Sequence, residues 1–143
     1  MKKNKLIEFE IIEGNSTQIK YLYQLLNDRK FNISNINIPS YNEHKEFVIN
    51  NPYRVWYLVC ENENYIGTFY IKNDNSIGIN LINETQDNIH QILKYINEEY
   101  LPLDEKKSVI PGYFYINVPI ANKKLQEILS NFNINKIQVS YKI

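Results

Sequence analysis

The 143-residue chain is electrically balanced, with 16 basic and 16 acidic side chains. This balance excludes the broad basic surface of a typical nucleic-acid-binding protein and gives no sign of a membrane-surface patch. The sequence has no apolar run near the ~20 residues that a membrane span requires, and its start, MKKNKLIEFE, lacks the pattern of a signal peptide.

The first half of the chain predicts one strand and two helices. A moderately alternating strand covers residues 6–12 and ends before Gly14. Asn15 or Ser16 then caps a helix whose apolar residues recur at helical spacing as far as residues 28–29. Residues 31–38 lack such a stripe and are expected to be irregular. Ser40-Tyr41-Asn42-Glu43 has capping-box spacing and predicts a short helix to about residue 50, packed through Tyr41, Phe47 and Val48.

Three strands are expected next, over residues 53–61, 65–72 and 76–82. The turns between them are short, which favours an antiparallel meander. The first strand carries Trp56 as a core residue and the only cysteine, Cys60, as a buried core thiol. With one cysteine no internal disulfide can form, so we expect a reducing cytoplasm. The length of 143 residues predicts a single domain over residues 1–143.

The third of these strands runs directly into a helix over residues 85–100, which Thr85 can cap. A proline-containing loop follows, and then a strand over 112–118, a helix over 122–131 and an alternating closing strand over 134–143. The predicted order is β-α-α-β-β-β-α-β-α-β, with a parallel crossover from strand 76–82 to strand 112–118. The helix start at residue 85 offers unpaired N–H groups, which suit a phosphate.

This order resembles the GNAT superfamily of N-acetyltransferases across nearly the whole chain. SYNEHKEFVINNPYRVWYLV (40–59) looks like the second helix and second strand of one bacterial branch, and ENENYIGTFYIKNDNSIGINL (61–81) looks like its hairpin. The Asn-led helix and closing strand over residues 122–141 are also similar. The resemblance implies an α/β (α+β) fold, with a mostly antiparallel twisted sheet that splays between its parallel fourth and fifth strands.

The resemblance also implies acetyl-CoA as co-substrate, held where those two strands part. The motif Arg/Gln-x-x-Gly-x-Gly/Ala that wraps the pyrophosphate is degenerate here, because Gln86 fits but Ile89 and Gln91 occupy the glycine positions. Ile89 would crowd a phosphate, and Asp87 adds a negative charge. The junction between strand 76–82 and helix 85–100 is therefore either structural only or binds the cofactor through its main-chain N–H groups. The expected cofactor-binding residues are Leu81, Ile82, Gln86, Asn88, Ile89, His90, Gln91 and Asn122.

No catalytic residue is identified by pattern, although two candidates can be named. His44 lies on the helix that borders the acceptor side in the family and has a suitable pKa for a base, or it is a surface or half-buried helix residue. Asn80 could orient a water or an amine, or it is an exposed strand residue. The resemblance places Leu129 where a proton-donating Tyr often lies. Asn35, Tyr113 and Tyr115 are expected to line the substrate cleft, unless the two tyrosines pack in the core.

Two functions are consistent with these residues. The first is an acetyl-CoA-dependent N-acyltransferase that acts on a primary amine of a small molecule by direct transfer in a ternary complex. The alternative is a non-catalytic GNAT-like binding or interaction module that has lost acetyl-CoA binding. Neither needs a metal, since no spaced His, Cys or carboxylate cluster is present. A homodimer could form through the closing strand or the sheet edge.

Overall fold

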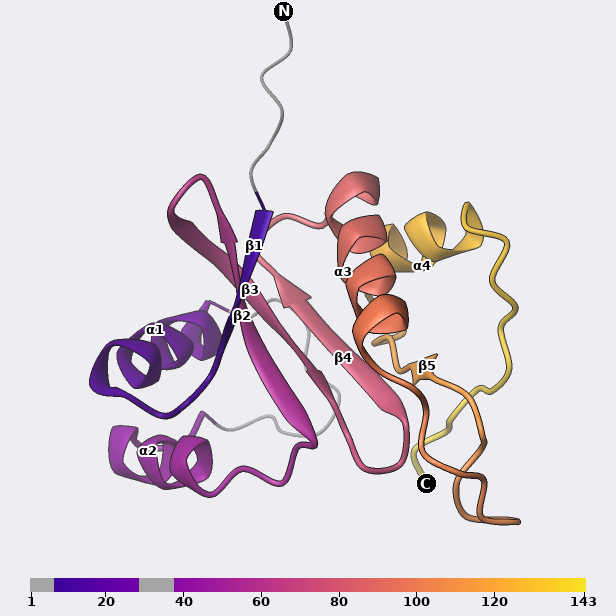
Figure 1. The fold of residues 1–143 in the computed structure, drawn as a ribbon, viewed down its shortest axis with the longest axis horizontal. Helices are drawn as coiled ribbons and strands as arrows, with labels where there is room; N and C mark the ends of the chain where they lie inside the picture. The colour runs from indigo at the N-terminus through magenta and orange to yellow at the C-terminus, as the bar shows by residue number, and fades with distance from the viewer. Residues whose placement is uncertain (1–6, 29–37) are drawn as a thin grey trace, which may run out of the picture.

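A computed structural model describes residues 7–28 and 38–143, in which a five-stranded sheet carries two helices on each face (Figure 1). The strands lie in the order β1-β2-β3-β4-β5. Neighbours are antiparallel as far as β4, and the β4–β5 pair is parallel. The elements are β1 (Ile7–Ile11), α1 (Ser16–Asn27), α2 (Tyr41–Ile49), β2 (Val55–Glu61), β3 (Asn64–Ile71), β4 (Ser76–Leu81), α3 (Gln86–Glu99), β5 (Tyr115–Ile116) and α4 (Lys123–Ser130). The predicted fold class and order are confirmed from the first strand to α4.

The closing strand predicted over residues 134–143 is wrong. The segment lies outside the sheet, and its alternating apolar residues are exposed, with Ile137 and Val139 both at 57%. The period-2 pattern does favour extended backbone, but a strand also needs a hydrogen-bonding neighbour, and the described part of the chain supplies none. β5 is also shorter than the predicted strand 112–118, because only two of its residues pair with β4.

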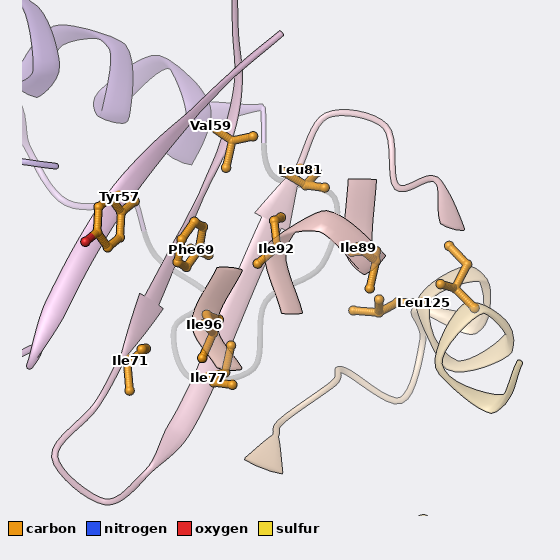
Figure 2. Close-up of a cluster of buried hydrophobic side chains, with 11 residues drawn as sticks. Tyr57, Val59, Phe69, Ile71, Ile77, Leu81, Ile89, Ile92, Ile96 and Leu125 are labelled. Atoms are coloured by element: carbon orange, nitrogen blue, oxygen red, sulfur yellow. The ribbon is translucent and has the colours of Figure 1, made fainter. Parts of the chain in front are cut away.

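Each face of the sheet has its own hydrophobic core. On the face under α3 and α4, Tyr57, Phe69 and Ile77 pack against Ile92 and Leu125 (Figure 2). On the face under α1 and α2, the neighbouring β2 residues Trp56 and Leu58 pack with Ile19, Leu22 and Val48. Successive β2 side chains point to opposite faces, so the same strand supplies both cores.

The helices α1 and α2 both begin with side-chain caps. The complete two-way capping box is at the start of α1, between Asn15 and Gln18, and not at the predicted position. In α2, Ser40 Oγ accepts a hydrogen bond from the Glu43 N–H, which is one half of such a box. Tyr41 and Phe47 were expected to pack inward but are 43% exposed, because this short helix buries only His44 and Val48.

Cys60 lies near the end of β2 and is half-buried rather than fully buried. Burial raises the pKa of its thiol, and the charges of Glu10 and Glu8 raise it further. Within residues 7–28 and 38–143, no helix is long and apolar enough to cross a membrane.

Candidate functional site

The main feature of the sheet is the short contact between β4 and β5. Only Ser76 and Ile77 of β4 pair with β5, opposite Tyr115 and Ile116, so β5 lies beside the first part of β4 alone (Figure 1). The rest of β4 continues without a neighbour on that side among the described residues. The predicted splay between the fourth and fifth strands is therefore present.

The register of β4 with β3 decides which main-chain groups face this opening. Lys72 N–H donates to Ser76 O and Ile82 N–H donates to Ile66 O, both at 2.8 Å. In an antiparallel pair such bonds recur at every second residue, so Gly78 and Asn80 also turn their main-chain groups toward β3. The N–H and C=O groups of Ile79 and Leu81 then point the other way. We call these groups the open edge.

One side chain fixes where the opening begins. Asn75 is completely buried, with a positive φ of 70°, and ends the turn before β4. Its Nδ2 donates to Leu103 O at 3.0 Å and to Pro111 O at 2.7 Å, and its Oδ1 accepts from Leu103 N–H at 2.7 Å. Its own carbonyl accepts from Tyr115 N–H. Asn75 thus attaches the α3–β5 loop and β5 to the start of β4.

The start of α3 lies beside the far end of β4, and some of its N–H groups form hydrogen bonds within the helix and its cap. Thr85 Oγ1 accepts from Asn88 N–H at 3.1 Å, and Thr85 O accepts from Ile89 N–H at 3.0 Å. His90 and Gln91 lie one turn inside α3, where N–H groups bond to the preceding turn. The first-turn N–H groups of Gln86 and Asp87 have no acceptor among the described residues, and they remain available to an anion.

The side chains that the sequence placed in this turn have different surroundings. Ile89 is fully buried, and Figure 2 shows it beside Leu125 of α4, so it does not crowd the helix start. Asp87 Oδ2 accepts from Gln91 Nε2 at 2.8 Å along the helix surface. His90 is exposed, with its ring 5.9 Å from that of Phe132. The Asp87 carboxylate remains as a negative charge at the helix start.

Asn122 joins α4 to the loop before α3. Its Oδ1 caps α4 by accepting from Leu125 N–H at 3.1 Å, and its Nδ2 donates to Glu84 Oε1 at 2.7 Å. Glu84 Oε2 and Asn88 Oδ1 are buried, and no described residue donates to either. Buried acceptors of this kind are usually satisfied by a partner or by water. The junction therefore holds two free acceptors beside the free N–H groups of the helix start.

A hollow of about 350 Å³ lies between α1 and the end of β4. Its lining comprises Tyr21, Gln24, Leu25, Asn27, Asp28 and Ile82. The Tyr21 hydroxyl is buried without a described partner, and burial raises its pKa to about 12. Sequence reasoning missed the α1 residues here, because a helical stripe shows which side faces the sheet but not where a hollow remains.

The two catalytic candidates occupy different places on this face. His44 is 5% exposed between α2 and α1, with its ring 5.3 Å from that of Tyr23. Burial lowers its pKa, and a hydrogen bond to the Ile19 backbone opposes this. Asn80 is half-buried on β4, and its side chain bonds to no described residue. No hydrogen bond joins the two candidates.

The expected cleft tyrosines lie at the other end of β4. Tyr115 pairs with Ser76, and burial together with the neighbouring Asp74 carboxylate raises the pKa of its hydroxyl. It lines a second hollow, of about 360 Å³, with Tyr113. Five residues at about 3.3 Å each separate this end from Leu81, so roughly 16 Å lies between the two places. Asn35 lies outside the described residues. The described ranges hold no group of three His, Cys, Asp or Glu that could bind a metal.

Comparison with solved structures gives close matches in fold at low sequence identity. A domain from Methanocaldococcus jannaschii matches with a TM-score of 0.69 and 15% identity, over 96% of this chain and 93% of that one. The Campylobacter jejuni N-acetyltransferase PseH, in complex with acetyl coenzyme A, matches with a TM-score of 0.59 and 15% identity over 94% and 92%. Dodecameric spermidine N-acetyltransferase from Vibrio cholerae matches with a TM-score of 0.56 and 16% identity over 87% and 77%. No protein-family model and no curated protein matches the sequence.

Proposed function

We propose that this chain, which has the fold of the GNAT superfamily of N-acetyltransferases, transfers an acetyl group from acetyl-CoA to a primary amine of a small molecule. Support comes from structural neighbours that are N-acetyltransferases, one of them in complex with acetyl coenzyme A and another named for spermidine. We place the reaction in the cytoplasm, which a lone half-buried thiol suits because no internal disulfide can form.

The observation that carries this proposal is the open edge. Ile79 and Leu81 present main-chain donors and acceptors in the spacing of a β-ladder, and an extended chain of amides such as the pantetheine arm can pair with them. The first-turn N–H groups of Gln86 and Asp87 lie just beyond, where a pyrophosphate would follow the arm. One strand and the next helix thus offer complementary groups to both parts of the same ligand.

The chain's own contribution to transfer would be mainly positional. Acetyl-CoA supplies the acyl group as a reactive thioester. Pairing along the open edge would fix the arm, and a fixed arm reduces the entropy lost when an amine attacks. Asn80 lies on the same strand with a side chain that is free within the described chain, so it can orient the attacking amine or a water. The amine would enter from the hollow beside α1 and Ile82.

The non-catalytic module remains a second candidate, and the junction before α3 favours it. Asn122 uses both of its side-chain groups within the protein, on Leu125 N–H and on Glu84. Glu84 and Asp87 also place two carboxylates near the helix start, where they oppose a pyrophosphate. A protein with this junction could keep the fold while its opening takes a different ligand.

Calorimetric titration with acetyl-CoA and with CoA tests the proposed cofactor. We expect dissociation constants in the micromolar range, about −8 kcal/mol, because a main-chain ladder and a helix start are both engaged. No heat at millimolar ligand would exclude the enzyme and favour the module. If binding occurs, release of free CoA thiol in the presence of spermidine and other primary amines tests transfer itself.

Amide hydrogen exchange then tests the site within one strand. The amides of Ile79 and Leu81 should exchange quickly in the free protein and slowly with acetyl-CoA bound. Gly78 and Asn80 provide the internal control, because their amides already face β3 and should be protected in both states. Binding that leaves Ile79 and Leu81 unprotected would place the cofactor elsewhere.

A further inference from the structure

The ring of Tyr70 lies across β4 on the face of the sheet that carries α1 and α2. Tyr70 of β3 pairs directly with Gly78 of β4. A Cβ atom added to Gly78 would lie 2.1 Å from Tyr70 Cζ and 2.4 Å from the Tyr70 hydroxyl oxygen. Real Cβ atoms do not make contacts that short, so the ring occupies the space of a side chain at position 78. A glycine there lets the tyrosine of one strand reach over the next.

A second aromatic ring fixes the position of Tyr70. The rings of Tyr53 and Tyr70 are stacked, with centroids 4.0 Å apart and an interplanar angle of 2°. Tyr53 in turn packs edge-on against the buried Trp56, with centroids 5.0 Å apart. The Tyr70 hydroxyl itself forms no hydrogen bond with a described residue. The packing therefore holds in place a hydroxyl that the described part of the chain does not use.

This hydroxyl lies beside the first main-chain amide of the open edge. Gly78 immediately precedes Ile79, and β5 pairs with β4 only as far as Ile77. The 2.4 Å contact and standard bond lengths put the Tyr70 oxygen within about 6 Å of the Ile79 nitrogen. The Ile79 N–H and the Tyr70 hydroxyl are therefore two donors at one place, where β5 leaves β4.

The same face of β4 connects this place with the hollow beside α1. Alternate side chains of a strand share a face, so Asn80 and Ile82 lie on the side where the Tyr70 ring covers Gly78. Ile82 lines the hollow, and the Asn80 side chain bonds to no described residue. An amine that enters from the hollow would pass Asn80 and reach the Tyr70 hydroxyl.

We propose that the Tyr70 hydroxyl binds the thioester sulfur of acetyl-CoA and protonates it during transfer, an inference that rests on the proposed function. An arm that pairs with Leu81 and then with Ile79 brings its thioester end to the start of the open edge. The two donors there differ in chemistry. The Ile79 N–H can stabilise an oxyanion on the carbonyl but keeps its proton, whereas a phenol can give its proton away.

The proposed step leaves Tyr70 unchanged after each turnover. The amine nitrogen forms a bond to the carbonyl carbon, and the bond between that carbon and sulfur breaks with its electron pair on sulfur. Tyr70 donates its hydroxyl proton to the sulfur, so CoA leaves as the thiol. The phenolate oxygen of Tyr70 then takes the proton that the amine nitrogen loses, which restores the hydroxyl.

Calorimetry with CoA and with desulfo-CoA, in which a hydrogen replaces the thiol, tests the contact without turnover. Tyr70→Phe removes the hydroxyl and keeps the stacked ring. It should weaken binding of CoA about fivefold, which corresponds to one hydrogen bond, and change binding of desulfo-CoA less than about twofold. Tyr141→Phe is the matched control, because it removes a hydroxyl from a side chain that is 85% exposed, and it should change neither affinity.

Turnover then separates proton donation from binding. With acetyl-CoA and the best amine of the thiol-release assay, Tyr70→Phe should lower kcat about a hundredfold. The KM for the amine should change less than about threefold, because the lost group acts only while the bond to sulfur breaks. Urea unfolding should be the same for Tyr70→Phe and the unmodified chain, since the hydroxyl bonds to no described residue.

The outcomes distinguish the role of Tyr70 from the function itself. Equal weakening of CoA and desulfo-CoA by Tyr70→Phe would overturn the proposal, because the effect would then come from packing and not from a contact with sulfur. An unchanged kcat would overturn it as well, and in both cases the acetyltransferase would stand. An unmodified chain that binds neither ligand would instead remove the proposed function, and this inference with it.

Discussion

At the scale of single residues, buried polar side chains hold the connections of this protein in place. Gln18 accepts from the N–H groups of Glu13 and Gly14 and donates to Glu10 and Ile11 O, which fixes the entry to α1. Asn75 and Asn122 act similarly before β4 and α4. The sequence could not single these residues out, since Asn is frequent throughout the chain and an Asn with three buried bonds looks like any other.

His44 should make stability depend on pH. Burial lowers its folded-state pKa below the ordinary value of 6.5, so the unfolded state binds the proton more readily. Stability is therefore full above about pH 6.5 and is lost as the pH falls below it toward the folded-state pKa. His44→Phe keeps a ring beside Tyr23 and should flatten this loss. Urea unfolding at about pH 7.5 and about pH 5 measures it.

His90 supplies the matched control, because it is the other histidine of the sequence and is exposed. His90→Gln should leave the difference in unfolding free energy between the two pH values unchanged. If the two substitutions flatten the profile equally, burial of His44 is not its cause.

At the scale of elements, the loop between α3 and β5 depends on one side chain. Asn75→Gly keeps the positive φ but removes the three bonds to Leu103 and Pro111, and we expect a loss of about 2–3 kcal/mol. Asn75→Ala should cost about 1 kcal/mol more, since alanine resists the left-handed backbone. Urea denaturation gives both values.

Asn133 allows the same Asn→Gly substitution at a positive φ, but at a position without buried hydrogen bonds. It has a φ of 59°, is exposed and forms no side-chain hydrogen bond with a described residue. Asn133→Gly should therefore change stability by less than about 0.5 kcal/mol. Equal losses at residues 75 and 133 would show that backbone freedom, and not the three bonds, holds the loop.

The elements themselves were largely predictable, but their pairing was less so. Thr85 was expected to cap α3 and does, because a threonine before a helical stripe has a strong local meaning. Leu81 and Ile82 were both expected to bind the cofactor. The structure turns the main chain of Leu81 toward the opening and bonds Ile82 N–H to Ile66 O. Which of two adjacent residues faces an edge depends on the register with the neighbouring strand, and the sequence of one strand alone does not determine that register.

At the scale of the molecule, one sheet separates two cores and should make them unfold together. Leu22 of α1 is 3% exposed, and Ile92 of α3 is fully buried. Leu22→Ala and Ile92→Ala should each cost about 2–5 kcal/mol, because each leaves a cavity in a packed core. Trp56, the single tryptophan, reports on the α1 side by fluorescence, and circular dichroism reports on the whole. The two signals should change at the same urea concentration in both variants.

A fluorescence transition of Leu22→Ala at lower urea than its circular dichroism transition would contradict this expectation. It would mean that the α1–α2 layer opens separately. We expect otherwise because β2 places Trp56 in one core and Tyr57 in the other, so neither face can lose its packing without disturbing the same strand.

The whole arrangement was predictable as far as local signals reach. The order of elements and the parallel crossover followed from turn lengths and periodicity, and the resemblance of that order to the GNAT superfamily implied the splay. The closing segment shows the limit of this reasoning. Its alternation of Ile137, Val139 and Tyr141 predicts a strand that the structure does not form, because periodicity does not say whether a neighbouring strand lies within hydrogen-bonding reach.

Cys60 decides how easily the proposed acetyl transfer can be followed. The freed thiol of CoA is commonly read with a disulfide reagent, which reacts with thiolates and would also report an accessible protein thiol. The one cysteine here is half-buried, and burial and two nearby glutamates keep its pKa raised and so disfavour its thiolate. The native protein should therefore contribute a slow, small background. Each equivalent of coloured product that forms quickly would then correspond to one CoA released and one turnover.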